Sequence, residues 1–423
     1  MEQMKLELEN IVVNDIQWGE STTVKEGVLY VCKEEAINAL KDPAFRNIEL
    51  DFARPGESVR IIPVKDAIEP RVKVENGEFF PGFLGGFDKT GRGKTKVLKG
   101  SCVITAGSIV CYQEGIIDMS GPASEFIPFS KTNNIVIVAE VNDDVLPDEH
   151  ETAIRLAGIK LAHYLAKSCI DVEADYTETY ELEPVKTKLP KVAYANLLLA
   201  QGLLHDNYLY GLDAKGIQTT LLHPNELLDG AVVSGNCVTA SDKNTTYDQE
   251  NNPIINELFK RHGKDLDFCG VIASPISTVL AGKERSAASV ANLCSMLDID
   301  AIIVSEEGGG NPEADIMMIA EAVEKVGTKA VLLLHETAGE RGDTEPLVNS
   351  TPVADAVVTA GNKHEYVKLP KMDKVIGNLD TLEILAGYGN KERYEDGSIE
   401  VRTAVIIDAI SNLGSGKRTG ITY

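Results

Sequence analysis

Short stretches of alternating apolar and polar residues dominate the first third of the chain. They cover 57–74 and 95–121 and are interrupted by the turn-forming sequences RPGE, ENGE and TGRG. A continuous apolar run over 133–141 is typical of a buried strand. The pattern predicts a β-rich N-terminal domain over residues 1–145.

A helical pattern follows this region. Asp148 and Glu151 have the spacing of a capping box, and apolar residues recur at intervals of three and four up to Leu165. After an acidic connector over 171–189, the apolar stretch 190–204 predicts a strand that runs into a loop. We interpret 146–236 as an α/β segment.

From residue 266 onward, predicted strands and helices alternate. The strands cover 267–274, 300–310, 328–339, 355–361 and 373–378, and the helices cover 282–298, 311–327 and 401–413. Such alternation is typical of a mostly parallel sheet that is covered by helices. The fold class is therefore mixed α/β, in which a β-rich N-terminal region precedes α/β regions and 237–423 forms the last α/β domain.

The carboxyl ends of the predicted parallel strands are where ligand sites collect in such sheets. These ends carry Ser305–Gly310, His335–Thr337 and Thr359–Gly361. The loop SEEGGG offers Glu306 or Glu307 as a residue that faces the substrate, or it is only a capped turn between a strand and a helix. His205 and His335 each precede a carboxylate, as acid/base pairs can, or each lies in an ordinary loop.

Charge and cysteine usage limit the classes of partner, compartment and cofactor that fit this chain. The chain has 41 Lys and Arg against 65 Asp and Glu, so its net charge of −24 argues against nucleic acid and anionic membranes as partners. We find no signal-peptide pattern and no apolar run long enough for a membrane span, and we expect a cytoplasmic protein with reduced thiols. The sequence lacks a C-x-x-C pair, zinc-ligand spacing and a G-x-G-x-x-G fingerprint, so we predict no metal and no NAD.

An unusual junction lies in the middle of the chain. The apolar run 231–233 ends at Ser234 and Gly235, and Asn236 and Cys237 follow directly. One interpretation is a buried cysteine in a turn. A free nucleophile would need a partner that lowers its pKa, and an intein-type junction usually has His where Gly235 stands.

Self-cleavage at the bond between Asn236 and Cys237 is a further interpretation. The Cys237 thiol attacks the preceding carbonyl and forms a thioester, and Gly235 allows the backbone bend that this attack needs. Hydrolysis then leaves Cys237 as an N-terminal nucleophile. Elimination of the sulfur instead leaves dehydroalanine, which loses ammonia and becomes a pyruvoyl group.

Several long stretches of the sequence resemble one family. The stretches 53–82, 201–217, 234–247, 251–272, 306–318 and 372–380 are similar to the proprotein of component B of glycine, sarcosine and betaine reductases. The similarity runs from about residue 5 to the C-terminus. The D-proline reductase proprotein resembles the chain more distantly and shares the Asn-Cys junction.

This resemblance implies cleavage between Asn236 and Cys237, which gives fragments of 236 and 423 − 236 = 187 residues. A covalent, self-generated pyruvoyl group replaces Cys237 and condenses with a small amine substrate, whose C–N bond is then cleaved reductively. Asp242, His205 and Glu307 are our candidates for proton transfer around it.

The resemblance also implies partners, because the chain has no redox pair of its own. They are a selenoprotein subunit of component B, selenoprotein A, which receives the carbon fragment, and protein C, which releases acetyl phosphate. We therefore expect a hetero-oligomer. The alternatives are a D-proline-reductase-like pyruvoyl subunit, an N-terminal-nucleophile cysteine amidohydrolase and an uncleaved, non-catalytic scaffold.

Overall fold

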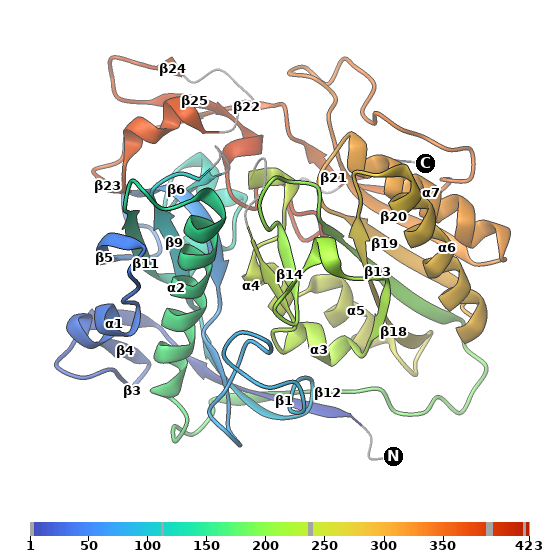
Figure 1. Cartoon of the computed structure of the whole chain (residues 1–423), viewed down its shortest axis with the longest axis horizontal. Coiled ribbons are helices and arrows are strands. Elements are labelled where there is room, and N and C mark those ends of the chain that lie inside the picture. Colours follow the sequence, from blue (N-terminus) through green and yellow to red (C-terminus); the bar gives the residue numbers. More distant parts are fainter. Residues whose placement is uncertain (1–3, 111–113, 236–239, 386–391, 418–419, 423) are drawn as a thin grey trace.

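Two large sheets lie side by side in the computed structural model, which describes residues 4–110, 114–235, 240–385, 392–417 and 420–422. The first sheet lies on the left of Figure 1 with helix α2, and the second lies on the right. The first has the strand order β10-β6-β9-β11-β5, and β23 pairs with β6. Its strands are β5 (Phe45–Ala53), β6 (Val59–Ile68), β9 (Ser101–Gly107), β10 (Gly115–Asp118), β11 (Asn133–Val141) and β23 (Lys374–Gly377).

Two smaller sheets complete the N-terminal region and confirm that it is rich in β-structure. One has the order β12-β1-β8-β7 and the other the order β2-β4-β3. Their strands are β1 (Lys5–Val12), β2 (Asp15–Trp18), β3 (Thr23–Lys25), β4 (Val28–Val31), β7 (Arg71–Lys73), β8 (Gly93–Lys99) and β12 (Tyr176–Glu181). A short helix, α1 (Lys33–Ala39), packs against α2.

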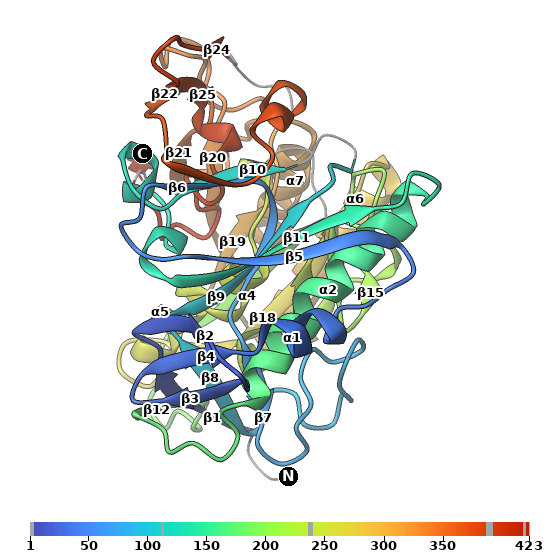
Figure 2. The same cartoon turned by 90° about the vertical axis from the view of Figure 1, so that its left-hand side faces the viewer.

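The long helix α2 (Pro147–Lys167) covers one face of the first sheet and contacts β6 and β9 (Figure 2). Ala157, Leu161 and Leu165 are buried on this face, as the apolar period predicts. The helix starts slightly earlier than expected, since Leu146 is the N-cap and its backbone N–H donates to the Glu149 carboxylate over 3.4 Å. Among the helices in the described ranges, none is both long and apolar enough to cross a bilayer.

The second sheet has seven strands in the order β16-β18-β13-β19-β20-β21-β26. Five neighbouring strands, β18, β13, β19, β20 and β21, are parallel, and the two edge strands are antiparallel to them. The strands are β13 (Lys191–Leu199), β16 (Thr220–Leu222), β18 (Asp267–Ile276), β19 (Ala301–Glu306), β20 (Lys329–Glu336), β21 (Val357–Asn362) and β26 (Gly420–Thr422). The prediction of a mostly parallel sheet is confirmed.

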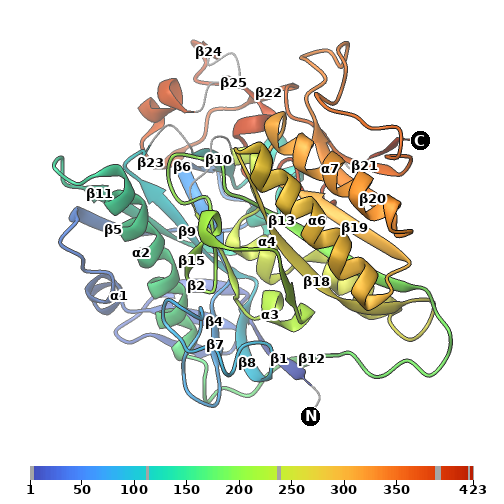
Figure 3. The same cartoon turned by 45° about the vertical axis from the view of Figure 1, so that its right-hand side comes forward.

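Helices cover both faces of this sheet, because alternate residues of a strand point to opposite sides. Ala193 and Leu197 of β13 pack toward α6 (Leu280–Leu297) and α7 (Asn311–Lys325), which lie in front of the strands in Figure 3. Tyr194 and Leu198 face the opposite side, where α5 (Pro253–Arg261) packs. The remaining elements are α3 (Pro224–Leu228), α4 (Thr246–Glu250), β14 (Asn207–Leu209), β15 (Leu212–Asp213), β17 (Val232–Ser234), β22 (Tyr366–Leu369), β24 (Glu392–Arg393) and β25 (Ile399–Arg402).

Two predictions for the C-terminal part need correction. The strand expected at 373–378 exists as β23, but it extends the first sheet by pairing with β6. The stretch 401–413 is not a helix: it contains the end of β25, one 3-10 turn (Thr403–Val405) and irregular backbone. Here the Ile407 N–H donates to Ile116 of β10 over 3.0 Å, and Asp408 has a φ of 55°, so contacts with the first sheet outweigh helical periodicity.

Candidate functional site

Asn236 and Cys237 lie outside the described residues, which resume at Ala240. The chain on either side of them is held firmly. Ser234, the last residue of β17, donates from its backbone to the Thr246 hydroxyl over 3.0 Å and from its own hydroxyl to the Asn244 carbonyl over 2.9 Å. Residues before and after the predicted cleavage point are therefore tied together.

Gly235 occupies a place where no side chain fits. Its N–H donates to the Asp206 carbonyl over 2.7 Å. A Cβ at this position would overlap the carbonyl oxygen of His205 and would lie 2.8 Å from that of Asp206. Glycine is required here because two backbone segments approach too closely for any other residue.

A buried lysine lies at the same point. The Lys243 ammonium donates hydrogen bonds to the carbonyl oxygens of Gly235 and Asp206. A positive charge thus contacts the carbonyl of the residue that precedes Asn236. Sequence reasoning missed Lys243, because a lysine in a polar stretch gives no signal that it will be buried.

Glu307 connects the loop after β19 to this region. Its carboxylate accepts from the Leu199 N–H over 2.8 Å, the Asn207 side-chain amide over 2.5 Å and the Asn244 N–H over 3.0 Å. Burial raises the pKa of Glu307, and the nearby Lys243 opposes that rise. Both oxygens are used in hydrogen bonds, so Glu307 holds the end of β13 against the chain that follows Ala240.

Glu306 differs from Glu307 because its carboxyl oxygens are not used in hydrogen bonds with the described residues. It is 1% exposed, and neither carboxyl oxygen has a hydrogen-bond partner within the ranges that the structure describes. Burial, with the neighbouring Glu313 and Asp315, raises its pKa well above the usual value. Its surroundings therefore favour the protonated form of Glu306, which is able to donate a proton. The loop SEEGGG had pointed to Glu306 or Glu307, and the structure distinguishes their surroundings.

Asp242 lies between two residues from the ends of the parallel strands. Its carboxylate contacts the Lys363 ammonium over 2.9 Å and lies 3.5 Å from Nε2 of His335. Lys363 follows β21 directly, and His335 is near the end of β20. The ends of β20 and β21 thus meet at Asp242. Lys363 gave no sequence signal.

The protonation of His335 can be inferred from its neighbours. The Asn412 amide N–H donates to the Ser241 carbonyl over 3.0 Å, which turns its oxygen toward Nδ1 of His335 at 3.1 Å. Nδ1 therefore carries the hydrogen and Nε2 has a free lone pair. Burial, and then Lys363, lowers the pKa of His335 to about 4, so the ring is neutral at pH 7. Gly309 lies against this ring, since a Cβ there would be 2.7 Å from Nε2.

The imidazole of His205 belongs to a neighbouring cluster. Its Nδ1 lies 3.2 Å from the Glu151 carboxylate and its Nε2 lies 3.9 Å from Asp213, and the hydrogen bond with Glu151 raises its pKa. Only the backbone of His205 contacts the region of Gly235. The structure thus brings together Gly235, Asp242 and Glu307 and turns the His205 ring away from them.

The strand order places this site where ligands bind in doubly wound sheets. β13 is the first strand of the parallel set, β18 lies on one side of it, and β19, β20 and β21 follow on the other. In this arrangement, ligands occupy the carboxyl end at the point where the order reverses, here between β13 and β19. Leu199 of β13 and Glu307 after β19 meet there with Asn244. No group of three or more His, Cys, Asp or Glu side chains in the described part of the chain is arranged to hold a metal.

Comparison with known proteins covers nearly the whole chain. The profile of the family described as glycine/sarcosine/betaine reductase component B subunits matches residues 4–420. "Glycine reductase complex component B subunits alpha and beta" of Acetoanaerobium sticklandii is 48% identical over 99% of this chain and 100% of its own length. "Sarcosine reductase complex component B subunit alpha" of Peptoclostridium acidaminophilum is 45% identical over 99% and 100%.

A more distant relative is the "D-proline reductase proprotein PrdA" of Acetoanaerobium sticklandii. It is 19% identical over 77% of this chain and 53% of its own length. No solved structure matches the chain. The similarity to component B is therefore much higher and more complete than the similarity to the D-proline enzyme.

Proposed function

The chain belongs to the family of glycine/sarcosine/betaine reductase component B subunits, and from this membership we propose that it is a proprotein that splits between Asn236 and Cys237. It is a component of a multi-subunit amino-acid reductase, an oxidoreductase. The name of the glycine reductase relative joins two subunits, alpha and beta, and this chain covers its whole length. One precursor that gives two subunits is the simplest explanation of that name.

The observation that carries the proposal is the packing around Gly235. Two backbone segments leave no room for a Cβ, and the Lys243 ammonium contacts the Gly235 carbonyl. Such a fixed, positively charged environment directly before Asn236 would orient the backbone for attack by the Cys237 thiol and favour negative charge that develops nearby. The thiol forms a bond to the Asn236 carbonyl carbon as the peptide C–N bond breaks. Elimination then removes the thiocarboxylate, and water replaces the nitrogen, which leaves as ammonia.

The described neighbours fit a covalent pyruvoyl group at position 237. A pyruvoyl ketone supplies an electrophilic carbon that condenses with amines and withdraws electrons. On the side of Ala240, the Ser241 hydroxyl and Nε2 of His335 are buried polar atoms that lack a hydrogen-bond partner among the residues described. Buried polar groups are rarely left in this state unless a missing group or a chemical role requires them.

The proton-transfer roles follow from these environments. Nε2 of the neutral His335 is able to accept a proton, and the Glu306 carboxyl is able to donate one. Lys363 neutralises Asp242, which keeps that carboxylate in place beside His335. Glu307 and Lys243 position the backbone. Asp242 thus polarises the base, His335. His205 acts on the site only indirectly, through its contact with Glu151.

The reaction is reductive cleavage of the C–N bond of glycine or an N-methylated glycine. A secondary or primary amine can condense with a ketone, whereas the quaternary nitrogen of betaine cannot, so a betaine-specific member of the family would use the carbonyl in another role. The electrons come from a selenoprotein subunit of component B. Selenoprotein A then receives the carbon fragment, and protein C releases it as acetyl phosphate.

Intact mass of the purified protein tests this function, before and after treatment with borohydride or hydroxylamine. The proposal expects two fragments of 236 and 187 residues, of which the second reacts as a carbonyl compound and resists Edman degradation. A second fragment with a free N-terminal Cys would establish an amidohydrolase instead. A chain that stays uncut in the assembled native complex would establish a scaffold.

The two fragments are expected to remain associated. β13 precedes the cleavage point and pairs with β18 and β19, which follow it, and β23 of the second fragment pairs with β6 of the first. Separation would break both large sheets. Native mass spectrometry of the cleaved protein should therefore find the pair together.

A further inference from the structure

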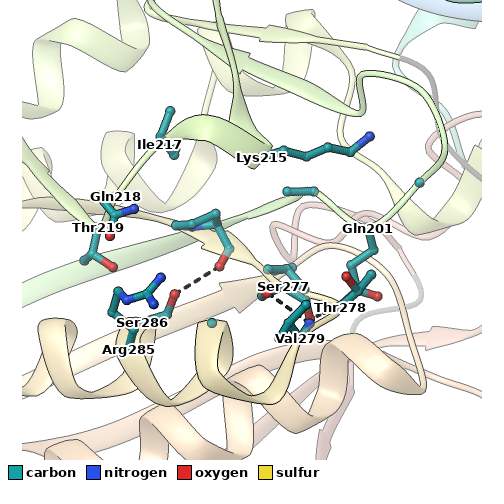
Figure 4. A pocket seen from close by; sticks show the side chains of 15 residues that line it. Gln201, Lys215, Ile217, Gln218, Thr219, Ser277, Thr278, Val279, Arg285 and Ser286 are labelled. Atoms are coloured by element: carbon teal, nitrogen blue, oxygen red, sulfur yellow. Dashed lines mark hydrogen bonds between the residues drawn. The ribbon is translucent and has the colours of Figure 1, made fainter.

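A cavity of about 330 Å³ lies beside the site, between the carboxyl ends of β13 and β18 and the first turns of α6. Figure 4 shows Gln201 reaching it from the loop after β13, and Arg285 and Ser286 from α6. Its lining consists of Ala200, Gln201, Gly202, Lys215, Ile217, Gln218, Thr219, Pro275, Ile276, Ser277, Thr278, Val279, Gly282, Arg285 and Ser286.

The charge of the lining is opposite to that of the whole chain. The net charge is −24, yet no Asp or Glu is among the residues that line the cavity, and both charged ones, Lys215 and Arg285, are cationic. Within the described ranges, Arg285 forms no ion pair with a carboxylate. The Lys215 ammonium donates to the Leu204 carbonyl. The other polar lining side chains are neutral amides and hydroxyls, so the cavity favours an anion.

One loop joins the cavity to the predicted cleavage point. Gly202 lines the cavity, and its N–H donates to the Asp206 carboxylate over 2.6 Å. The Asp206 backbone carbonyl accepts from Gly235 over 2.7 Å. The second carboxylate oxygen of Asp206 is buried and has no partner in the described part of the chain. The cavity is thus linked to Gly235 through Gly202 and Asp206.

Resting on the proposed function, we infer that this cavity binds the carboxylate of the glycine-type substrate and that Arg285 recognises it. The guanidinium matches a carboxylate with two parallel hydrogen bonds. The amine end is then left free for condensation with a carbonyl group. The carboxylate is the feature that glycine and its N-methylated forms share, so one anchor serves them all.

Direct binding tests this inference without catalysis. In a Cys237→Ala background, which cannot form the carbonyl group, ligand-observed NMR measures glycine, sarcosine, betaine and acetate against glycinamide and inorganic phosphate. The carboxylates should bind, and glycinamide should not. Arg285→Gln should weaken carboxylate binding roughly 10- to 100-fold. Arg261→Gln is the matched control, because Arg261 ends α5 near the start of β18, at the opposite edge of the sheet, and should leave binding unchanged.

The outcomes separate this inference from the proposed function. Equal carboxylate binding by Arg285→Gln and the parent would overturn the carboxylate site even if the mature protein carries a carbonyl. Phosphate that binds while glycine-type carboxylates do not would also overturn it. Carboxylate binding that depends on Arg285, together with a mature protein that retains Cys237 and never forms a carbonyl, would support the site and refute the pyruvoyl function.

Discussion

Two sets of buried polar residues, here called clusters, differ in how their polar atoms are used. The paired cluster consists of Asp66, Glu151 and Arg155. The unpaired cluster consists of Ser241, Glu306 and His335. In the first, every carboxylate oxygen has a partner. In the second, a hydroxyl, a ring nitrogen and a whole carboxyl lack hydrogen-bond partners in the described residues.

The paired cluster has a positioning role. Asp66 of β6 accepts from the Thr246 N–H over 2.9 Å and from its hydroxyl over 2.7 Å, and the same hydroxyl accepts from Ser234 over 3.0 Å. Arg155 of α2 neutralises both Asp66 and Glu151 at 3.1 and 3.0 Å. The first sheet thus holds the chain before and after the predicted cut.

The contrast shows how burial separates structural from chemical groups. A buried ion pair adds little net stability because desolvation offsets its attraction, but removal of one partner is strongly destabilising. Unsatisfied groups are unfavourable for stability and are retained where chemistry needs them. Substitutions in the two clusters should therefore have opposite effects on stability and activity.

Glu306→Gln should have the largest effect of all and should appear only in activity. Glutamine has nearly the shape of a protonated glutamic acid but cannot donate that proton. We expect a loss of about 10²- to 10⁴-fold in kcat of the assembled reductase, typical of a lost general acid. Cleavage, measured by intact mass, and the free energy of unfolding should change little.

Glu307→Gln is the matched control, because it makes the same chemical change one residue away. Glu307 accepts three hydrogen bonds with its two carboxylate oxygens. In glutamine, the NH₂ group that replaces one oxygen would face an N–H donor, and that hydrogen bond would be lost. We expect about 1–3 kcal/mol of destabilisation and slower cleavage. If the two variants lost activity and stability in the same proportion, the distinction between these carboxyl groups would be wrong.

Arg155→Met should have the largest effect on stability. It leaves Asp66 and Glu151 buried without their cation, which typically costs about 3–5 kcal/mol. Denaturant unfolding of the uncleaved Cys237→Ala chain measures this. Arg46→Met removes the exposed pairs with Glu140 and Asp143 and should cost less than about 1 kcal/mol. Equal losses would show that the paired cluster is not a special support.

The fold class could be predicted from the sequence because its signals are local. The run 133–141 is β11 with the same bounds, and the alternation after 266 gives β18, α6, β19, α7 and β20 in order. The failure at 401–413 has a non-local cause, since those apolar residues pack on β10 and the first sheet. Periodicity contains no information about such partners.

The site was only partly predictable for the same reason. The carboxyl ends of strands pointed to Glu306 and His335, whose positions follow from topology. Lys243 and Lys363 were missed, because charged side chains are usually exposed and nothing local indicates their burial. Which of two adjacent glutamates keeps free oxygens depends on Leu199, Asn207 and Asn244, far away in the sequence.

Acid should weaken the protein through His335. Burial and Lys363 lower the pKa of His335 to about 4, while an unfolded histidine titrates near 6.5. As the pH falls from 6.5 to 4, the His335 imidazole binds a proton in the unfolded chain but not in the folded one. Up to roughly 3 kcal/mol of stability is therefore lost. His150 and His223, with pKa values also lowered to about 4, should add to this loss.

His335→Gln tests how much His335 contributes to the loss of stability in acid. The pH dependence of the free energy of unfolding should become shallower between pH 6.5 and 4, and the change should persist in the Cys237→Ala background. An unchanged slope would mean that folding does not lower the pKa of His335. The buried environment on which the assignment of Nε2 as a proton acceptor rests would then be wrong.

Gly235→Ala should have a moderate effect on stability but a specific effect on cleavage. The added methyl group overlaps the His205 carbonyl, so the backbone must shift, at a cost of about 1–3 kcal/mol. That shift moves the Gly235 carbonyl from Lys243, and intact mass should reveal uncut precursor. Gly216→Ala is the control, since a Cβ there meets nothing within 4 Å. If Gly235→Ala were cleaved as fast as Gly216→Ala, close packing before Asn236 would not be what drives the reaction, and the role given to Lys243 would fail with it.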